Sequence, residues 1–317
     1  MNRREFLALA AATPFAVRSG AAFARPVPLA LVTCDTEARV AVVDVDAGHV
    51  VRSIPVLPDP RSIERVGAGD ALVCHTNVGA LSIIDGRSLR VRHVLDDFVQ
   101  PRYTAAHPDG RHAFVTDSGS EEVVAVDLTI GRSLGRLHLG GWARHLTLDA
   151  SARTLWVGLG NVAAHLAVVD VSDPTRPTLL RTVTPPFLAH DVSFLPDGAH
   201  VWVTSGDQGK MAVYQASGEA RRLLPADAAP QHVTFGAAVA YVTSGVAGTI
   251  RVHSLRDGRV LRTTPIPVGS YNVQQGTGGR VLTPSLDRGT LSILDAHGGL
   301  LHEVHVSSSS HDACFVV

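Results

Sequence analysis

Residues 311–317 read HDACFVV, and a nearly identical stretch, HDVSF, occurs at residues 190–194. The earlier copy is followed by a turn (LPDG), a second apolar run (AHVWVTS) and a third (KMAVY). The later copy has no such continuation in the sequence. We therefore expect residues 311–317 to form the first strand of a repeating unit whose other strands lie elsewhere in the chain.

The repeating unit recurs along the whole chain. Seven apolar runs, from VAVVD to LSILD, end at a spacing of 40 to 44 residues, at Asp44, Asp85, Asp127, Asp170, Tyr214, Ser254 and Asp295. An earlier run such as LVT, FVT or YVT precedes each of them, and Gly, Asp, Asn and Pro separate the runs, which predicts short buried strands. Four strands in 40–45 residues are typical of one β-propeller blade. The sequence therefore predicts an all-β, seven-bladed propeller of four-stranded antiparallel blades over residues 25–317.

The two ends of the repeat complement each other. Residues 28–57 supply the second, third and fourth strands of a blade without a first strand, and residues 311–317 supply a first strand alone. We predict that the C-terminal strand joins the N-terminal blade and closes the ring. Such closure removes the open sheet edges that would otherwise invite aggregation.

The first 24 residues predict a separate targeting segment. MNRREFLALAAATPFAVRSGAAFA has a charged start with Arg3 and Arg4, an apolar run and an A-x-A cleavage pattern ending at Ala24. RREFLAL resembles the twin-arginine (Tat) export signal; an ordinary Sec signal is the alternative. This apolar run is too short to span a bilayer and is interrupted by Pro14. We expect a periplasmic or secreted protein with no transmembrane span in its mature part.

Composition limits the classes of function. Charged residues make up 18% of the 317 residues and the formal net charge is −1, so there is no basic excess to recruit nucleic acid. The three cysteines, Cys34, Cys74 and Cys314, form neither CxxC nor CxxCH, which argues against a thioredoxin-like site and covalent haem attachment. We expect all three to be small buried strand residues. The familiar HExxH and G-x-S-x-G signatures of proteases and hydrolases are also missing.

Several motifs carry a family resemblance. YVTSG at 241–245, WVTSG at 202–206, FVTDSG at 114–119 and the PDG turns at 108–110 and 196–198 resemble the YVTN-repeat, or YncE-like, seven-bladed propellers. The resemblance extends more weakly to the d-type haem propeller of cytochrome nitrite reductases. It implies a fold more than a function, because these motifs encode strands and turns. Their threonines, at positions 33, 116, 204, 243 and 283, are accordingly expected to be structural.

One residue per blade begins the first strand, in a loop that we expect to approach the central channel. These seven positions are Arg61, Arg102, Arg144, His190, Gln231, Tyr271 and His311. Each guanidinium can bind a carboxylate or phosphate with two hydrogen bonds, so we predict that the three arginines clamp an anionic ligand. The further predicted ligand contacts are His190, Tyr271 and His311. In the alternative, the arginines merely pair with rim carboxylates such as Asp35, Asp117 and Asp207.

Histidines occupy this position or the next one in four blades, at His145, His190, His232 and His311. Imidazole is a common ligand of copper, zinc and iron, so His190, His232, His311 and Asp312 are weak candidates for a metal site. Adjacent strand residues point to opposite sides. We therefore expect His190 and His311 to face the channel, and His145 and His232 to pack between blades.

Three functions remain open from the sequence. The first is a binding or accessory protein of a periplasmic redox system that holds an anionic small molecule or cofactor; the resemblance implies a tetrapyrrole such as a d-type haem, and copper is the other candidate. The second is a lactonase-like, lyase-like or metal-dependent oxidoreductase enzyme that uses channel His, Asp and Arg residues. The third is a protein-interaction scaffold.

Overall fold

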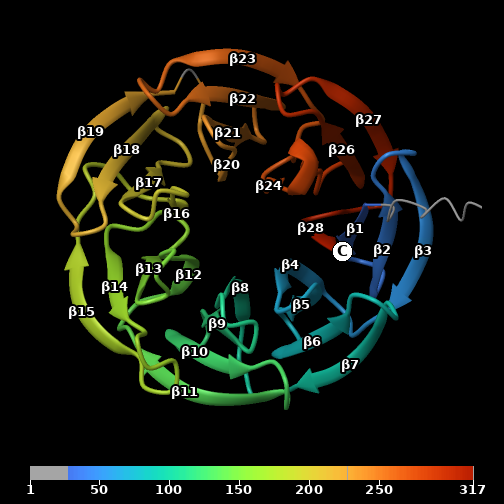
Figure 1. Cartoon of the computed structure of the whole chain (residues 1–317), viewed down its shortest axis with the longest axis horizontal. Helices are drawn as coiled ribbons and strands as arrows, with labels where there is room; N and C mark the ends of the chain where they lie inside the picture. Colours follow the sequence, from blue (N-terminus) through green and yellow to red (C-terminus); the bar gives the residue numbers. More distant parts are fainter. Residues whose placement is uncertain (1–27, 227, 317) are drawn as a thin grey trace, which may run out of the picture.

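The computed structural model describes residues 28–226 and 228–316, and the predicted export signal lies outside them. The chain forms seven four-stranded antiparallel sheets arranged as blades around a central axis, which confirms the predicted propeller (Figure 1). Apart from one 3-10 turn at Thr277–Gly279, these residues contain no helix. No helix in the described part of the chain is therefore long and apolar enough to cross a membrane.

Each blade runs from an innermost first strand to an outermost fourth strand (Figure 1). The first four blades are β28 (Ala313–Val316), β1 (Leu29–Cys34), β2 (Arg39–Asp44), β3 (His49–Pro55); β4 (Pro60–Val66), β5 (Asp70–His75), β6 (Ala80–Asp85), β7 (Arg90–Leu95); β8 (Pro101–Ala106), β9 (His112–Asp117), β10 (Glu122–Asp127), β11 (Arg132–His138); and β12 (Ala143–Leu148), β13 (Thr154–Leu159), β14 (Leu166–Asp170), β15 (Thr178–Val183). The other three are β16 (Val192–Phe194), β17 (His200–Thr204), β18 (Lys210–Gln215), β19 (Ala220–Pro225); β20 (Val233–Phe235), β21 (Val239–Ser244), β22 (Thr249–Ser254), β23 (Val260–Pro265); and β24 (Gln274–Gln275), β25 (Val281–Pro284), β26 (Thr290–Leu294), β27 (Leu300–His305).

The aspartates that mark the sequence period end the third strands and shape the outer turns. Asp44 accepts hydrogen bonds from the backbone amides of Asp46 and Ala47, and Asp127 does the same for Thr129 and Ile130. An aspartate that binds backbone amides two and three residues later stabilises a turn. In the five blades that have it, the repeated Asp therefore marks where the third strand turns into the outermost strand.

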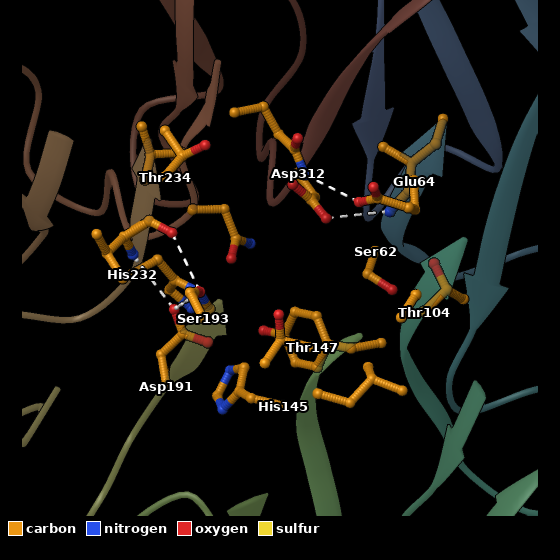
Figure 2. A pocket seen from close by; sticks show the side chains of 18 of the residues that line it. Ser62, Glu64, Thr104, His145, Thr147, Asp191, Ser193, His232, Thr234 and Asp312 are labelled. Atoms are coloured by element: carbon orange, nitrogen blue, oxygen red, sulfur yellow. Dashed lines mark hydrogen bonds and ion pairs between the residues drawn. The ribbon is translucent and has the colours of Figure 1, made fainter. Parts of the chain in front are cut away.

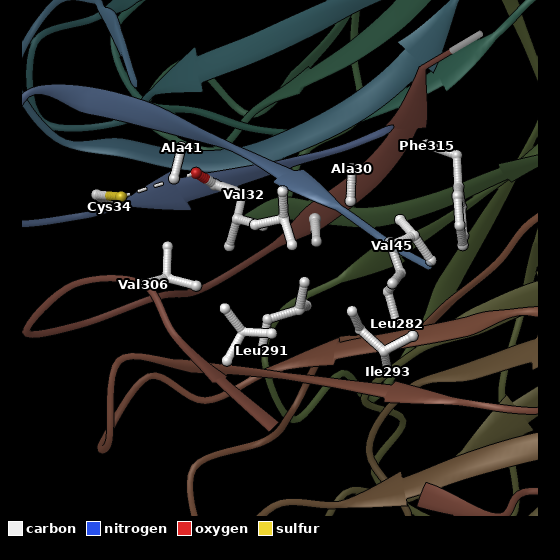
Figure 3. Packing of buried hydrophobic residues seen from close by; sticks show 13 residues of the cluster. Ala30, Val32, Cys34, Ala41, Val45, Leu282, Leu291, Ile293, Val306 and Phe315 are labelled. Atoms are coloured by element: carbon white, nitrogen blue, oxygen red, sulfur yellow. Dashed lines mark hydrogen bonds between the residues drawn. The ribbon is translucent and has the colours of Figure 1, made fainter. Parts of the chain in front are cut away.

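The C-terminal strand closes the ring as predicted. β28 pairs antiparallel with β1 from Leu29 opposite Val316 to Val32 opposite Ala313, so the chain ends inside the blade in which the described chain begins (Figure 1). The ring is held by the hydrophobic packing of neighbouring blades: Figure 3 shows Ala30, Val32 and Phe315 of the closing blade against Leu282 and Ile293 of the next. The three cysteines are buried and free, as expected.

Threonines of the VT motifs join one blade to the next. Thr116 donates a hydrogen bond of 2.5 Å to the carbonyl oxygen of Arg144, and Thr204 donates one of 2.6 Å to that of Gln231. Thr33 and Thr243 make the same contact with the corresponding residues of the following blades. The structural role predicted for these four threonines is therefore confirmed, and the contact sets the position of the residues that enter the channel. The buried hydroxyl of Thr283 makes no such bond.

Candidate functional site

One side chain from every blade lines a cavity of about 300 Å³ in the central channel. These seven residues, which we call the channel ring, are Ser62, Tyr103, His145, Asp191, His232, Asn272 and Asp312. Figure 2 shows His232, Asp191 and His145 on one side of the cavity, with Asp312 and Glu64 across from them. The residues one position earlier form what we call the mouth ring: Arg61, Arg102, Arg144, His190, Gln231, Tyr271 and His311.

The expectation that His145 and His232 pack between blades is wrong, because both line the cavity. Strict alternation of side chains requires a regular strand. The pairing of β12 with β13 shifts register between Ala143 and Leu146, which is a bulge at the position of His145. His232 precedes β20, which begins at Val233, and there Gln231 and His232 both bond through their backbones to Thr243, so two residues oppose one as in a bulge. Irregular entry into the first strand therefore lets two successive residues face the channel.

Three histidines from consecutive blades form a compact group, which we call the histidine cluster. The ring centre of His145 lies 4.8 Å from that of His190 and 4.7 Å from that of His232. One ring nitrogen from each of the three residues lies within 4.8 Å of the others. Of the predicted metal candidates, His190 and His232 belong to this cluster, whereas His311 and Asp312 do not. His145, the third member of the cluster, was not among those candidates.

A hydrogen bond orients one of the three rings, and a carboxylate lies near a second. His190 Nδ1 lies 3.0 Å from the carbonyl oxygen of Asn161, which can only accept, so Nδ1 carries the proton and Nε2 keeps a lone pair. His232 Nδ1 lies 3.6 Å from the carboxylate of Asp191. Both ring nitrogens of His145 are buried and lack a hydrogen-bond partner. An unsatisfied buried polar group of this kind requires an explanation.

The cluster is electrically neutral near pH 7. Burial lowers the pKa of His190 to about 4, and it lowers the pKa of His145 and His232 well below the usual value. The Arg144 guanidinium contributes to all three shifts, because a nearby positive charge disfavours the imidazolium form. Uncharged imidazoles keep the lone pair that a metal ion or a proton donor would use.

The three predicted arginines do not behave alike. Arg61 forms an ion pair of 3.2 Å with the buried Asp35, so the alternative of carboxylate pairing holds for this residue. Within the described residues, no carboxylate lies within 4.0 Å of the Arg102 or Arg144 guanidinium. The Nε atoms of both are buried without a hydrogen-bond partner. Burial, followed by the charges of Arg144 and Arg61, lowers the pKa of Arg102.

Trp142 is a functional candidate that the sequence analysis missed. The guanidinium carbons of Arg102 and Arg144 each lie 5.2 Å from the centre of its ring. The Arg144 guanidinium also lies 5.8 Å from the ring of Tyr103, which in turn lies 4.4 Å from the ring of His145. An aromatic surface thus connects the arginines to the histidine cluster. The available signal was a tryptophan two residues before Arg144 in a glycine-rich loop.

The remaining predicted residues have internal contacts. His311 Nδ1 lies 3.0 Å from the carbonyl oxygen of Arg61, and the carbonyl oxygen of His311 accepts a hydrogen bond of 2.8 Å from Asn272. The Asp312 carboxylate accepts hydrogen bonds from the backbone amides of Ile63 and Ala313. These bonds tie the closing strand to the neighbouring blade, so both side chains hold the ring together at the channel.

Tyr271 lies against the preceding blade. A Cβ atom at Gly245 would lie 2.5 Å from its ring, so glycine leaves the space that the ring occupies. The carbonyl oxygen of Tyr271 accepts the hydrogen bond of Thr243. Tyr271 is therefore packed at the mouth ring, on a different blade from Arg102 and Arg144.

Deeper in the cavity, Glu64 and Gln274 face each other. Gln274 Nε2 donates a hydrogen bond of 3.0 Å to the Glu64 carboxylate. Burial raises the pKa of Glu64 to about 7, and the hydrogen bond from Gln274 opposes that shift only in part. This part of the channel is thus polar, and its carboxyl group can exchange a proton near neutral pH.

Comparison with known proteins gives a fold and no family. No sequence-family model and no curated protein matches the chain. Among solved structures, hydrazine synthase from Kuenenia stuttgartiensis aligns with a TM-score of 0.73 and 15% identity, covering 84% of this chain and 91% of that one. A protein of unknown function from Desulfotomaculum acetoxidans aligns with a TM-score of 0.79 and 10% identity, covering 91% and 98%.

A third similar structure is the dihydro-heme d1 dehydrogenase NirN in complex with DHE. It aligns with a TM-score of 0.66 and 13% identity, covering 92% of this chain and 75% of that one. Identities this low establish the propeller fold alone, because one fold hosts many unrelated activities. The predicted resemblance to the YVTN-repeat family therefore holds at the level of the fold.

Proposed function

We propose that this propeller is an exported protein that binds an anionic small molecule at the mouth of its central channel, with Arg102 and Arg144 as the main anion contacts. The observation that carries the proposal is the pair of arginines without a carboxylate partner, each with a buried and unpaired Nε atom. Two guanidinium groups near one tryptophan repel each other. An anion between them removes the repulsion and accepts charge-assisted hydrogen bonds.

The aromatic surroundings favour a flat, conjugated ligand that carries carboxylates. Trp142 and Tyr103 provide ring faces beside the arginines. A drug-sized ligand needs a site of roughly 300–1,000 Å³, so a tetrapyrrole would fill more than the 300 Å³ channel cavity and would extend into the mouth. The similarity to the DHE-bound NirN structure supports a carboxylate-bearing tetrapyrrole as the first candidate, with His190 beside it.

Native mass spectrometry of the mature protein, purified from its own host, tests this proposal. We expect a bound mass that is lost on denaturation, and we expect the Arg102→Ala/Arg144→Ala variant to lack it. Arg256→Ala, at an exposed side chain in another blade, is the matched control and should retain the bound mass. A folded wild-type protein with no bound mass would contradict the proposal, as would a double variant that keeps its ligand.

Titration with mesoporphyrin, a dicarboxylate tetrapyrrole, gives a second readout. A hydrogen bond to a charged group contributes about 1.5–3 kcal/mol, so each arginine removed should weaken binding by roughly 10- to 100-fold. Trp142→Ala should weaken it as well while leaving the charges in place. Equal affinity of wild type and double variant would reject the arginines as the anion contacts.

The export part of the proposal rests on the twin-arginine signal predicted at residues 1–24. An Arg3→Lys/Arg4→Lys variant, expressed in the host, should remain unprocessed in the cytoplasm. The wild-type protein should appear in the periplasm without the signal. Unchanged export of the variant would point to the Sec route instead.

A further inference from the structure

We propose that His145, His190 and His232 form a binding site for one divalent transition-metal ion, with Cu²⁺ bound more tightly than Zn²⁺. The site lies in the channel beside the proposed anion site and does not depend on it, since no arginine supplies a ligand. Three imidazole nitrogens suit copper and zinc, whereas magnesium and calcium prefer oxygen ligands. Copper is placed first because it heads the Irving–Williams order.

The positions of the three rings carry the proposal. Each histidine comes from a different one of three consecutive blades, and one nitrogen of each lies within 4.8 Å of the other two. Metal–nitrogen bonds of 2.0–2.1 Å in tetrahedral geometry need nitrogens about 3.4 Å apart. The rings must therefore approach by roughly 1 Å, which small side-chain rotations provide.

The surroundings fix the His190 ring as those of a metal ligand normally do, and they place a carboxylate near the His232 ring. Ligating histidines donate their second nitrogen to a carbonyl or carboxylate oxygen, which sets the tautomer and directs the other nitrogen to the metal. His190 Nδ1 has the carbonyl oxygen of Asn161 at 3.0 Å, and His232 Nδ1 has the Asp191 carboxylate at 3.6 Å. The Nε2 atom of His190 is therefore left to bind the ion.

His145 provides the independent observation. It is 2% exposed, its ring centre lies within 4.8 Å of the centres of both other rings, and neither of its nitrogens has a hydrogen-bond partner. Leaving a buried polar side chain unsatisfied is costly, so such a group calls for an explanation. A metal ion bound to one nitrogen accounts for its place in the cluster.

A second group, His107, Asp109 and His112, also brings three potential ligands together but carries no such proposal. The Asp109 carboxylate already accepts hydrogen bonds from the ring of His112 and from the backbone amides of Arg111 and His112. It stabilises the exposed turn before β9, which explains the cluster without a metal. This group serves as the internal control.

Metal titration of the mature full-length protein tests the site. Protein stripped with a chelator and dialysed should bind one equivalent of Cu²⁺, and separately one of Zn²⁺, in calorimetry against a competing chelator. His145→Asn should weaken binding of each metal at least 100-fold, because one of the three ligands is lost. The His107→Asn/His112→Asn variant should bind as the wild type does. Electron paramagnetic resonance of the Cu²⁺ form should show coupling to three nitrogens.

Several results would overturn the assignment. One is a wild-type protein that binds neither metal more tightly than His145→Asn does, with both folded by circular dichroism. Another is loss of binding in the His107→Asn/His112→Asn variant, which would place the metal at the exposed turn. The Arg102→Ala/Arg144→Ala variant separates the two proposals, because it should lose the anionic ligand and keep the metal. If it loses the metal too, the histidines alone do not form the site.

Discussion

Replacing Val316 with alanine should destabilise the whole ring, because Val316 belongs to the one strand that joins the end of the chain to its beginning. Its side chain is 1% exposed and packs in a cluster that spans two blades, with Leu31 and Ile63 among its members. Removing two buried methyl groups costs about 1.6 kcal/mol in transfer free energy, and the cavity raises the total to about 2–3 kcal/mol. The total free energy of unfolding of a natural domain is about 5–15 kcal/mol, so this loss is a large fraction of it.

The assay is urea unfolding followed by tryptophan fluorescence. Trp156 and Trp202 are buried in blades distant from β28, so their signal reports the far side of the ring (Figure 1). Val51→Ala is the matched control, because Val51 lies on the outer strand of the same blade and is 48% exposed. Val51→Ala should change the free energy of unfolding by no more than about 0.5 kcal/mol.

The comparison of the two valines can refute the closure argument. If the Val316→Ala midpoint matched that of Val51→Ala, the closing strand would contribute little to stability. If only the closing blade melted early, leaving the tryptophan transition in place, the blades would unfold independently. Deletion of residues 313–317 is the stronger form of the test. It removes the whole of β28 and leaves β1 with an open edge, so we expect no cooperative unfolding and a tendency to aggregate.

Three further changes test other contacts. The pKa of Glu64 is raised to about 7 in the folded protein, so the folded state binds this proton more tightly than the unfolded state does. The free energy of unfolding of the wild type should therefore fall as the pH rises from about 5 to 8. Glu64→Gln lacks this proton, so its stability relative to the wild type should increase over the same range by up to about 3 kcal/mol. A pH-independent difference would contradict this sign. Thr116→Val should cost about 1–2 kcal/mol in urea unfolding, since the buried Arg144 carbonyl loses its inter-blade partner; a neutral result would show that packing alone holds these blades. Gly289→Ala should lower the melting temperature, because Gly289 has φ +61° and an added Cβ would meet the Ser307 carbonyl; unchanged melting would mean that this turn adjusts freely.

The repeat determined most of the fold in advance. Its period of 40 to 44 residues gave the number of blades, and the copy of HDVSF at the C-terminus indicated which strand closes the ring. These features are readable because buried strands need consecutive β-branched residues and each turn needs its own Asp or Gly. The sequence predicted that Thr116 has a structural role. It did not predict the partner, the Arg144 carbonyl oxygen, because that contact depends on how the blades pack in three dimensions.

The sequence predicted which residues lie near the channel, but it did not predict which way their side chains point. The mouth ring was found because it recurs at fixed offsets, but the alternation rule failed at His145, where a bulge turns the side chain into the channel. Whether an arginine is paired also depends on distances that sequence does not contain: Asp35 reaches Arg61, whereas Asp117 accepts hydrogen bonds from the backbone amides of the loop before β8. Bulges and ion pairs are local departures from the repeat, and the period carries no information about them.

Charge links the two proposed sites. Burial is the main cause of the low pKa of all three clustered imidazoles, and the positive charge of the Arg144 guanidinium adds to it. The same charge opposes a divalent cation there. An anion bound between Arg102 and Arg144 would neutralise it, so the anion should raise metal affinity. By thermodynamic linkage the metal must then raise anion affinity by the same factor. Among the described residues, the only carboxylate paired with the cluster is that of Asp191, 3.6 Å from His232 Nδ1. A bound anion would therefore offset the positive charge of Arg102 and Arg144, which no carboxylate of the described residues neutralises.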